Sequence, residues 1–396
     1  MLFLCIGIHE EAIPEPGAAS GSATCTVTQA GSKPVVAAGS FGGMKTVSDE
    51  KARPVVDWSL AASTGAFLVR GSGPSVPLAE AQLAVSELRE FSVDAEAHVR
   101  DLTGLGAGLP LLPGEVVDRP GWVRAAAAGL DSLTSNALRA LPSNPLAPVL
   151  ASGAGVQTGV VLAFLASRVL GQYDPFGGDG GRLLLVAPNV VTAQQAMQVP
   201  GRDFRLWVCL HESTHRLQFT AVPWLRDYFA DEVERLVGGL TAEDDGVTDL
   251  LGRLPEAVRE AKRAKEDGGI AALTQLLRSP QQREVFDKLL ALSTLLEGHA
   301  DYVMDAVGPG VVPAVELIRR RFTARRSGGG FFDRLLRTLL GIDAKIRQYA
   351  QGAAFTRHVV DRVGMSGFNA VWTSPNTLPD RAEIADPEAW VRRVHG

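Results

Sequence analysis

The sequence is poor in cysteine, and this scarcity excludes two kinds of structure. Only Cys5, Cys25 and Cys209 occur in 396 residues, and no two of them form a CxxC pair. A disulfide framework and a cysteine-built metal site are therefore not expected. Low cysteine use suits a reducing compartment, and the N-terminus has neither the basic region nor the long apolar core of a secretory signal. We therefore expect a cytoplasmic protein.

The sequence also lacks an excess of positive charge and a long purely apolar run. Its formal net charge is −5, which gives no electrostatic footprint for nucleic acid. The uncharged segment 145–167 has the length of a membrane span. Its small and polar residues, such as Gly153, Gln157 and Gly159, favour a buried core helix against which another helix packs closely. Neither nucleic acid nor a membrane is expected as a partner.

Residues 1–52 lack a sustained periodicity and are rich in Gly, Ala, Ser, Thr and Pro. They are predicted to form a disordered leader, and Met44 is a candidate for the native start. Residues 53–396 are predicted to form one domain.

Within that domain, apolar residues recur mainly at helical spacing. The predicted fold is mainly α with a small β element. The single predicted strand covers 182–187, followed by Pro188 and Asn189. Residues 171–175 are predicted to be a turn, and the proline-containing tail a loop-rich segment. Helices are predicted over residues 78–102, 121–141, 145–167, 204–219, 280–307, 311–326 and 331–352.

The pentapeptide 211–215 reads His-Glu-Ser-Thr-His. On a helix, His211 and His215 project from the same face one turn apart, so both imidazoles can reach one metal ion. Glu212 can then act as general base on a water at the metal. Arg216 places a charge where such helices usually keep an uncharged residue. The motif predicts zinc bound by His211 and His215.

A catalytic zinc site needs a third protein ligand. The pattern HExxHxxGxxH would supply a histidine, but Gln218 and Ala221 stand at its glycine and third histidine. A later predicted helix carries ExxxD instead, with Glu297 as the candidate ligand. Asp301, one turn on, could accept the remaining ring N–H of His211 or His215.

His299 is the rival to Glu297 as third ligand. It lies about 200° round the helix from Glu297, so the two side chains cannot easily face one metal, and Glu297 is preferred. His299 is also a candidate donor to the oxyanion that develops during hydrolysis. Tyr349 ranks first for that role because it lies in a polar stretch of an apolar segment. Tyr302 and Tyr173 are further candidates.

Together these segments resemble a zincin-like family of uncharacterised zinc metallopeptidases and hydrolases, found mainly in actinobacteria. The resemblance implies a mostly helical zincin-like fold, with one helix carrying HExxH and a later one carrying ExxxD, and a zinc site. It implies no substrate. It covers residues 55–394 and rests on residues 118–123, 171–175, 187–189, 207–219, 221–226, 296–308, 345–349 and 364–372.

Three functions remain open. The first is a zinc metallopeptidase in which the strand near residues 183–186 pairs with an extended peptide. The second is a zinc hydrolase of a small amide or ester. The third is a catalytically silent protein with structural zinc, which is disfavoured because structural sites normally have four protein ligands.

Overall fold

The computed structural model describes residues 5–6, 56–138, 147–178, 180–241, 279–326 and 342–396, and every structural statement below concerns them. Helices dominate, as the sequence predicts, and the structure is α+β. The expected leader over residues 1–52 lies outside the described residues except at Cys5–Ile6. The helices are α1 (Trp58–Leu68), α2 (Leu78–Thr103), α3 (Arg119–Leu138), α4 (Ala147–Ala166), α5 (Ala187–Met197), α6 (Gly201–Thr220), α7 (Leu225–Thr241), α10 (Pro280–Ala306), α11 (Val315–Arg326), α13 (Ile342–Phe368), α14 (Arg381–Ala385) and α15 (Pro387–His395), with 3-10 turns η1 (Asn369–Trp372) and η2 (Pro375–Thr377).

A small sheet has the strand order β1-β3-β4-β2. The strands are β1 (Cys5–Ile6), β2 (Glu115–Val117), β3 (Val169–Asp174) and β4 (Arg182–Val186). β3 is antiparallel to both β1 and β4, whereas β2 is parallel to β4. The prediction of a strand at β4 is confirmed. Because β4 has a partner on each side, the expectation that it pairs with an extended peptide is wrong.

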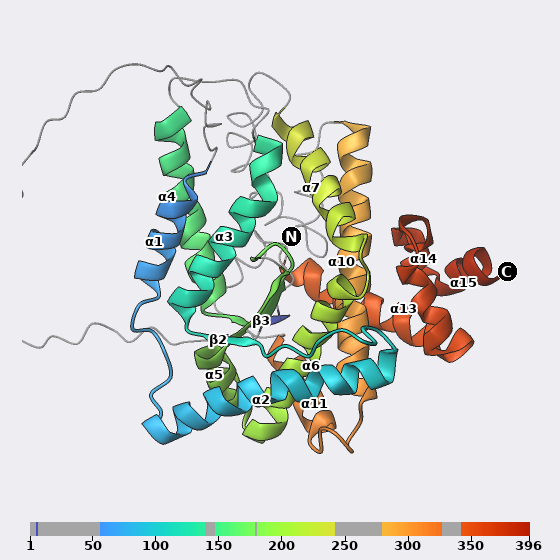
Figure 1. The fold of residues 1–396 in the computed structure, drawn as a ribbon, viewed down its shortest axis with the longest axis horizontal. Helices are drawn as coiled ribbons and strands as arrows, with labels where there is room; N and C mark the ends of the chain where they lie inside the picture. The colour runs from blue at the N-terminus through green and yellow to red at the C-terminus, as the bar shows by residue number, and fades with distance from the viewer. Residues whose placement is uncertain (1–4, 7–55, 139–146, 179, 242–278, 327–341) are drawn as a thin grey trace, which may run out of the picture.

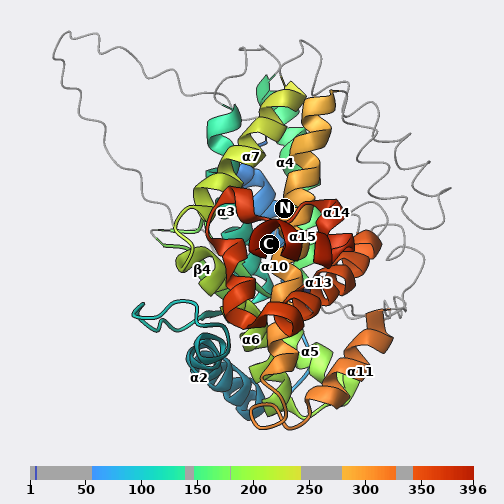
Figure 2. The same ribbon diagram turned by 90° about the vertical axis from the view of Figure 1, so that its right-hand side faces the viewer.

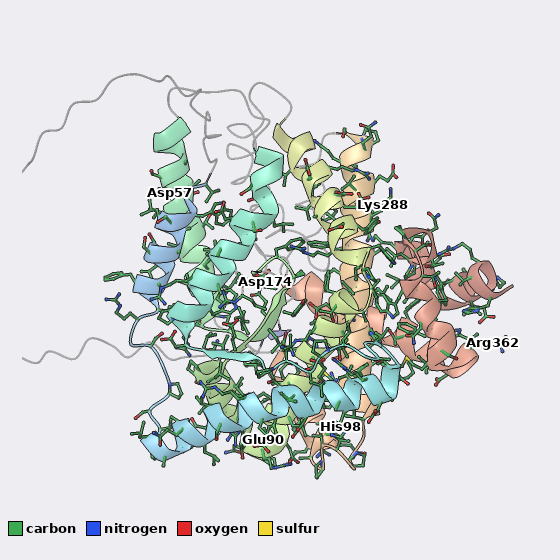
Figure 3. All side chains as sticks on the ribbon, viewed as in Figure 1. Asp57, Glu90, His98, Asp174, Lys288 and Arg362 are labelled. Carbon is green, nitrogen blue, oxygen red and sulfur yellow. The ribbon has the colours of Figure 1, made fainter. Side chains whose placement is uncertain are left out.

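β3 is the element that the sequence pattern misassigned, because residues 171–175 were predicted to be a turn. All six residues of β3 are buried, so the strand shows no alternation of polar and apolar residues to reveal it. Gly171 resembles a turn residue but lies against Glu212 of α6, whereas Asp174 is the last residue of the strand. Asp174 accepts a hydrogen bond from the Phe176 amide at 3.0 Å where the strand ends (Figure 3).

Helices α1 and α4 stand side by side at one edge of the molecule (Figure 1). Glycines make this approach possible: a Cβ on Gly65 would lie 2.8 Å from the carbonyl oxygen of Gly159. The predicted close packing on α4 is thus confirmed. However, Val156 and Val160 on α4 are exposed, so the helix is only partly buried. No helix in the described part of the chain is both long and apolar enough to cross a membrane.

Helix α6 occupies the core and packs against α2 and α10. Every side chain from Asp203 to Phe219 is buried, and α10 is buried through its middle, from Leu289 to Ala300. Figure 1 shows α2 crossing the molecule in front of α6, and the view in Figure 2 shows the C-terminal helices gathered on the α10 side. The core therefore centres on the two helices that were predicted to carry ligands.

The C-terminal region corrects two predictions. The helix predicted over residues 331–352 is α13, which continues to Phe368; its first predicted residues lie outside the described ranges. The tail forms short helices rather than a loop-rich wrap. Pro375 and Pro387 stand at the first helical turns of η2 and α15, where a missing N–H costs nothing. The prolines therefore start helices here.

Candidate metal centre

Three side chains from two helices converge in the core. His211 and His215 project from one face of α6, and Glu297 reaches them from α10. Their exposed fractions are 2%, 0% and 1%. One ligand atom from each residue lies within 4.8 Å of the others. This is the arrangement predicted from the HExxH and ExxxD patterns, and it favours Glu297 over His299 as the third ligand.

The three ligand atoms form a nearly equilateral triangle. The two Nε2 atoms of the histidines are 3.2 Å apart. Glu297 Oε2 lies 3.5 Å from Nε2 of His211 and 3.6 Å from Nε2 of His215. Ligands bound tetrahedrally to zinc at about 2.0–2.1 Å are separated by about 3.3–3.4 Å. The spacing of the donor atoms therefore fits one zinc-sized ion, with a fourth position left for water or substrate.

Burial also prepares His211 as a ligand. A metal ligand must be a neutral imidazole, and desolvation lowers the pKa of His211, while its hydrogen bond with Glu297 acts in the opposite direction. Burial is the larger cause, so the neutral form of this ring is favoured. The carboxylate of Glu297 then brings the only formal negative charge of the triad, which balances part of the charge of a divalent cation.

Glu212 follows His211 directly on α6 and is not one of the three clustered side chains. Its side chain is fully buried, and it packs against the backbone of Gly171 in β3. A Cβ on Gly171 would lie 2.6 Å from Cγ and 2.9 Å from Oε1 of Glu212. These distances are shorter than a van der Waals contact, so only glycine leaves room for the carboxylate. Gly171, which made β3 hard to recognise in the sequence, thus leaves the space for the side chain of Glu212, the predicted general base.

Gln218 is a site residue that the sequence interpretation missed. Its Oε1 is 2.8 Å from Nδ1 of His215, and its Nε2 is 2.9 Å from the carbonyl oxygen of Leu296 and 3.1 Å from Nδ1 of His299. In the sequence, Gln218 served only to exclude a third histidine ligand. Its position three residues after His215, on the same helical face, was the signal that could have identified it.

The charge of Arg216, unexpected on such a helix, has one partner on α2 and another in the segment that follows α2. Its guanidinium donates to Glu96 Oε2 at 2.7 Å and to the carbonyl oxygen of Leu112. Arg100 donates to the other oxygen of Glu96. Glu96 is 1% exposed, so this is a buried ion pair that joins α6 to α2, separate from the three ligands.

Asp301 follows Glu297 by one turn of α10, as predicted. Its Oδ1 accepts a hydrogen bond from Nη1 of Arg319 in α11 at 2.6 Å, and Asp305 accepts from the same guanidinium at 3.0 Å. Burial lowers the pKa of His211, and the negative charge of Asp301 acts against this shift. Because Nδ1 of His215 lies 2.8 Å from Oε1 of Gln218, the predicted hydrogen bond of Asp301 to a ligand histidine stays a prediction for His211 alone.

The candidate oxyanion donors fall in different places. Tyr173 donates its hydroxyl to the carbonyl oxygen of Gly180 at 3.1 Å, and burial raises its pKa to about 12. His299 is fully buried, and desolvation lowers its pKa to about 3, so its ring is neutral. Tyr302 lies on α10 and is partly buried. The side chain of Tyr349 lies outside the described part of the structure.

Two further segments of the resemblance meet behind β3. Arg119 donates through Nε to Asn189 Oδ1 at 2.7 Å, and the Asn189 amide donates to the carbonyl oxygen of Val169 at 2.6 Å. Trp122 donates through Nε1 to Gln172 Oε1 at 2.8 Å. These buried bonds anchor β3 on the side away from α6, because Gln172 and Gly171 point to opposite faces of the strand. The two segments therefore support the strand that carries Gly171.

Comparison with known proteins agrees with this geometry. Residues 56–391 match the zincin-like metallopeptidase family. A crystal structure of a proposed hydrolase with a novel fold from Chloroflexus aurantiacus is 29% identical; the likeness covers 85% of this chain and 98% of that chain, with a TM-score of 0.61. Among the curated proteins compared with the sequence, none matches. The family match spans most of the chain and includes both ligand-bearing helices, so the chain belongs to the zincin-like metallopeptidase family.

Proposed function

We propose that this protein is a zinc-dependent hydrolase, and specifically a metallopeptidase of the HExxH…ExxxD type. The observation that carries the proposal is the triangle formed by His211, His215 and Glu297, whose sides of 3.2, 3.5 and 3.6 Å suit one zinc ion. A catalytic site keeps an open fourth position, and three ligands meet that requirement. When bound, zinc would lower the pKa of a water molecule and polarise the scissile carbonyl.

Glu212 is the general base in this proposal. It follows His211 directly on α6, it is fully buried, and it lies outside the triangle of ligand atoms. A carboxylate in this position can remove a proton from the attacking water and later return it to the leaving amine. Gly171 leaves the space in which this carboxylate sits, so strand and helix together define where the proton is taken up.

The peptide bond is proposed as the substrate because extended backbone already lies along β3. Cys5–Ile6 pairs antiparallel with this strand, with Cys5 opposite Gly171. An extended peptide that took the place of β1 would therefore pass beside the residue that contacts Glu212. On this edge the peptide has to displace only the two-residue β1, whereas both neighbours of β4 are longer strands.

His299 is proposed as a donor to the oxyanion. Among the described residues its Nε2 has no hydrogen-bond partner, although the ring is fully buried. A buried N–H without an acceptor is costly, and a developing negative charge on substrate would satisfy it. Tyr349 remains the alternative donor from the sequence.

A second candidate function, hydrolysis of a small amide or ester, is favoured by one observation. The ligands and Glu212 are at most 2% exposed, and such enclosure suits a small substrate better than a folded protein. The third possibility, a silent zincin-like protein, is disfavoured by the presence of Glu212 beside a three-ligand site.

The decisive experiment pairs Glu212→Gln with a peptide-library digest. We expect the variant to bind zinc like the wild type and to lose turnover by at least about a thousandfold, because the general base alone is removed. Turnover that survives this change would remove Glu212 from the mechanism. Wild-type cleavage of peptides that stops with a chelator would establish the peptidase. Cleavage of small amides or esters alone would establish the second candidate.

A further inference from the structure

We propose that Gln218 is a positioning residue that fixes the ring tautomers of His215 and His299 at the same time and ties both ligand-bearing helices together. The inference deepens the proposed metal site and rests on it. The side chain of Gln218 is fully buried. One amide group makes three contacts, to His215, to Leu296 and to His299.

The contact with Leu296 decides which way the amide points. A backbone carbonyl oxygen can only accept a hydrogen bond, so the amide nitrogen of Gln218 must face it, and the 2.9 Å distance fits this bond. The amide oxygen is then on the other side, 2.8 Å from Nδ1 of His215. The orientation of the Gln218 amide therefore follows from the carbonyl oxygen that it faces.

The orientation fixes the tautomer of His215. Because Oε1 of Gln218 is an acceptor, Nδ1 of His215 must carry the proton. The lone pair of His215 then lies on Nε2, the atom that is 3.2 Å from Nε2 of His211 and 3.6 Å from Glu297. The ring is therefore held in the only neutral form that can bind a metal through Nε2.

The same amide fixes the opposite tautomer in His299. Nδ1 of His299 is 3.1 Å from the nitrogen of Gln218, and two donors cannot face each other at that distance. Nδ1 must accept, so the proton of the neutral ring is on Nε2. The imidazole ring itself packs against Phe368 and Trp372, whose centroids are 5.0 and 5.6 Å from the imidazole centroid. Gln218 thus orients His215 to bind a metal through Nε2 and His299 to donate a hydrogen bond through Nε2–H.

The bond to Leu296 adds a mechanical role. Leu296 immediately precedes Glu297 on α10, so this bond holds the backbone of the third ligand against α6, the helix of the first two. Removing it would loosen the distance between Glu297 and the histidines. Hydrogen-bonding partners of metal ligands typically contribute about 10–100-fold to metal affinity, and Gln218 supports two of the three ligands, one directly and one through the backbone.

The first test measures tautomers in the metal-free protein by long-range 15N–1H correlation spectroscopy of labelled histidines, assigned by single histidine substitutions. In the wild type we expect the proton of His215 on Nδ1 and that of His299 on Nε2. A proton on Nδ1 of His299, or on Nε2 of His215, overturns the proposal. This measurement needs no bound metal, so it stands apart from the proposed function.

The second test is Gln218→Met, a nearly volume-conserving change that removes all three bonds. We expect a 10–100-fold weaker zinc affinity in a competition assay, and loss of the single-tautomer pattern in His215 and His299. The matched control is Gln172→Met, which removes an equally buried amide bonded to Trp122 instead of to a histidine. Equal zinc affinity in both variants would overturn the proposal. A wild type that binds no zinc would defeat the proposed function instead, while the tautomers would still be decided by the first test.

Discussion

His215 and Arg216 are neighbours on α6, yet they enter two buried polar clusters of opposite design. In the cluster of Arg216, charges complement each other: its guanidinium and that of Arg100 both donate to Glu96. In the cluster of His215, the side chains instead converge, because three atoms that carry lone pairs lie 3.2–3.6 Å apart. The first cluster is complete as protein alone, whereas the second has the donor set of a cation site.

The contrast shows how burial can be interpreted functionally. Both clusters lie in the core, and both would be costly if their polar groups were unsatisfied. Burial alone therefore does not distinguish a structural ion pair from a ligand site. The distinction lies in the signs and atom types that face each other, and it predicts that damage to one cluster affects stability while damage to the other affects metal binding.

The largest expected effect is on metal content. His215→Ala removes one of three ligands, and we expect zinc affinity to fall by at least about a thousandfold, roughly 4 kcal/mol. Arg216→Met, one residue away, should retain zinc near the wild-type level because its partners are Glu96 and Leu112. Zinc measured by plasma emission on both purified proteins checks this. Equal zinc content in His215→Ala and the wild type would show that His215 does not bind the metal.

A comparison within α10 should give a smaller but still large difference. Glu297→Ala removes the third ligand, and we expect about 100–1000-fold weaker zinc binding, since one of three bonds is lost. His299→Ala leaves the triangle complete and disturbs it only through Gln218, so a loss of about tenfold or less is expected. Competition with a chelator measures both constants. A greater loss in His299→Ala would name His299 as the ligand.

The sequence could point to the candidate ligands because their arrangement is local. His211 with His215, and Glu297 with Asp301, are each one helical turn apart, so helical periodicity places them on one face without further information. The same periodicity disfavoured His299 beside Glu297. The helix expected over residues 280–307 is observed as Pro280–Ala306, because its capping Ser279, its proline and its apolar spacing all agree.

What the sequence could not supply depends on contacts between distant segments. The space beside Glu212 exists because Gly171 on β3 lacks a side chain, and no local pattern links the two. Gln218 acquires its role from Leu296 and His299 on another helix. The sequence pattern predicts a turn where β3 lies, because a strand buried on both faces loses the alternation by which strands are recognised. The side chain of Tyr349 lies outside the described residues, so that prediction stays open.

Disrupting the cluster of Arg216, Arg100 and Glu96 should lower the free energy of unfolding and leave zinc binding unchanged. Arg216→Met leaves Glu96 buried with Arg100 as its remaining partner. Removing one partner of a buried pair costs about 3–5 kcal/mol, and the remaining arginine should reduce this to about 2–4 kcal/mol. Chemical denaturation of the metal-free protein measures the change. The double variant Arg216→Met with Glu96→Leu should recover part of the loss, and failure to recover any would show that the pair is not the cause.

The smallest effect should come from a change in β3, the strand whose Gly171 contacts Glu212. Gly171→Ala would place a Cβ 2.6 Å from Cγ of Glu212, so the carboxylate must move by several tenths of an ångström. A displaced base lowers the rate, and we expect kcat to fall about 10–100-fold while zinc affinity stays within a factor of about three, because no ligand is touched. Gly153→Ala, on α4 with no atom within 4 Å of the added Cβ, is the matched control and should leave kcat unchanged. A Gly171→Ala protein with wild-type kcat would mean that the position of Glu212 is not set by β3. Loss of zinc with the loss of rate would place Gly171 among the supports of the ligands instead.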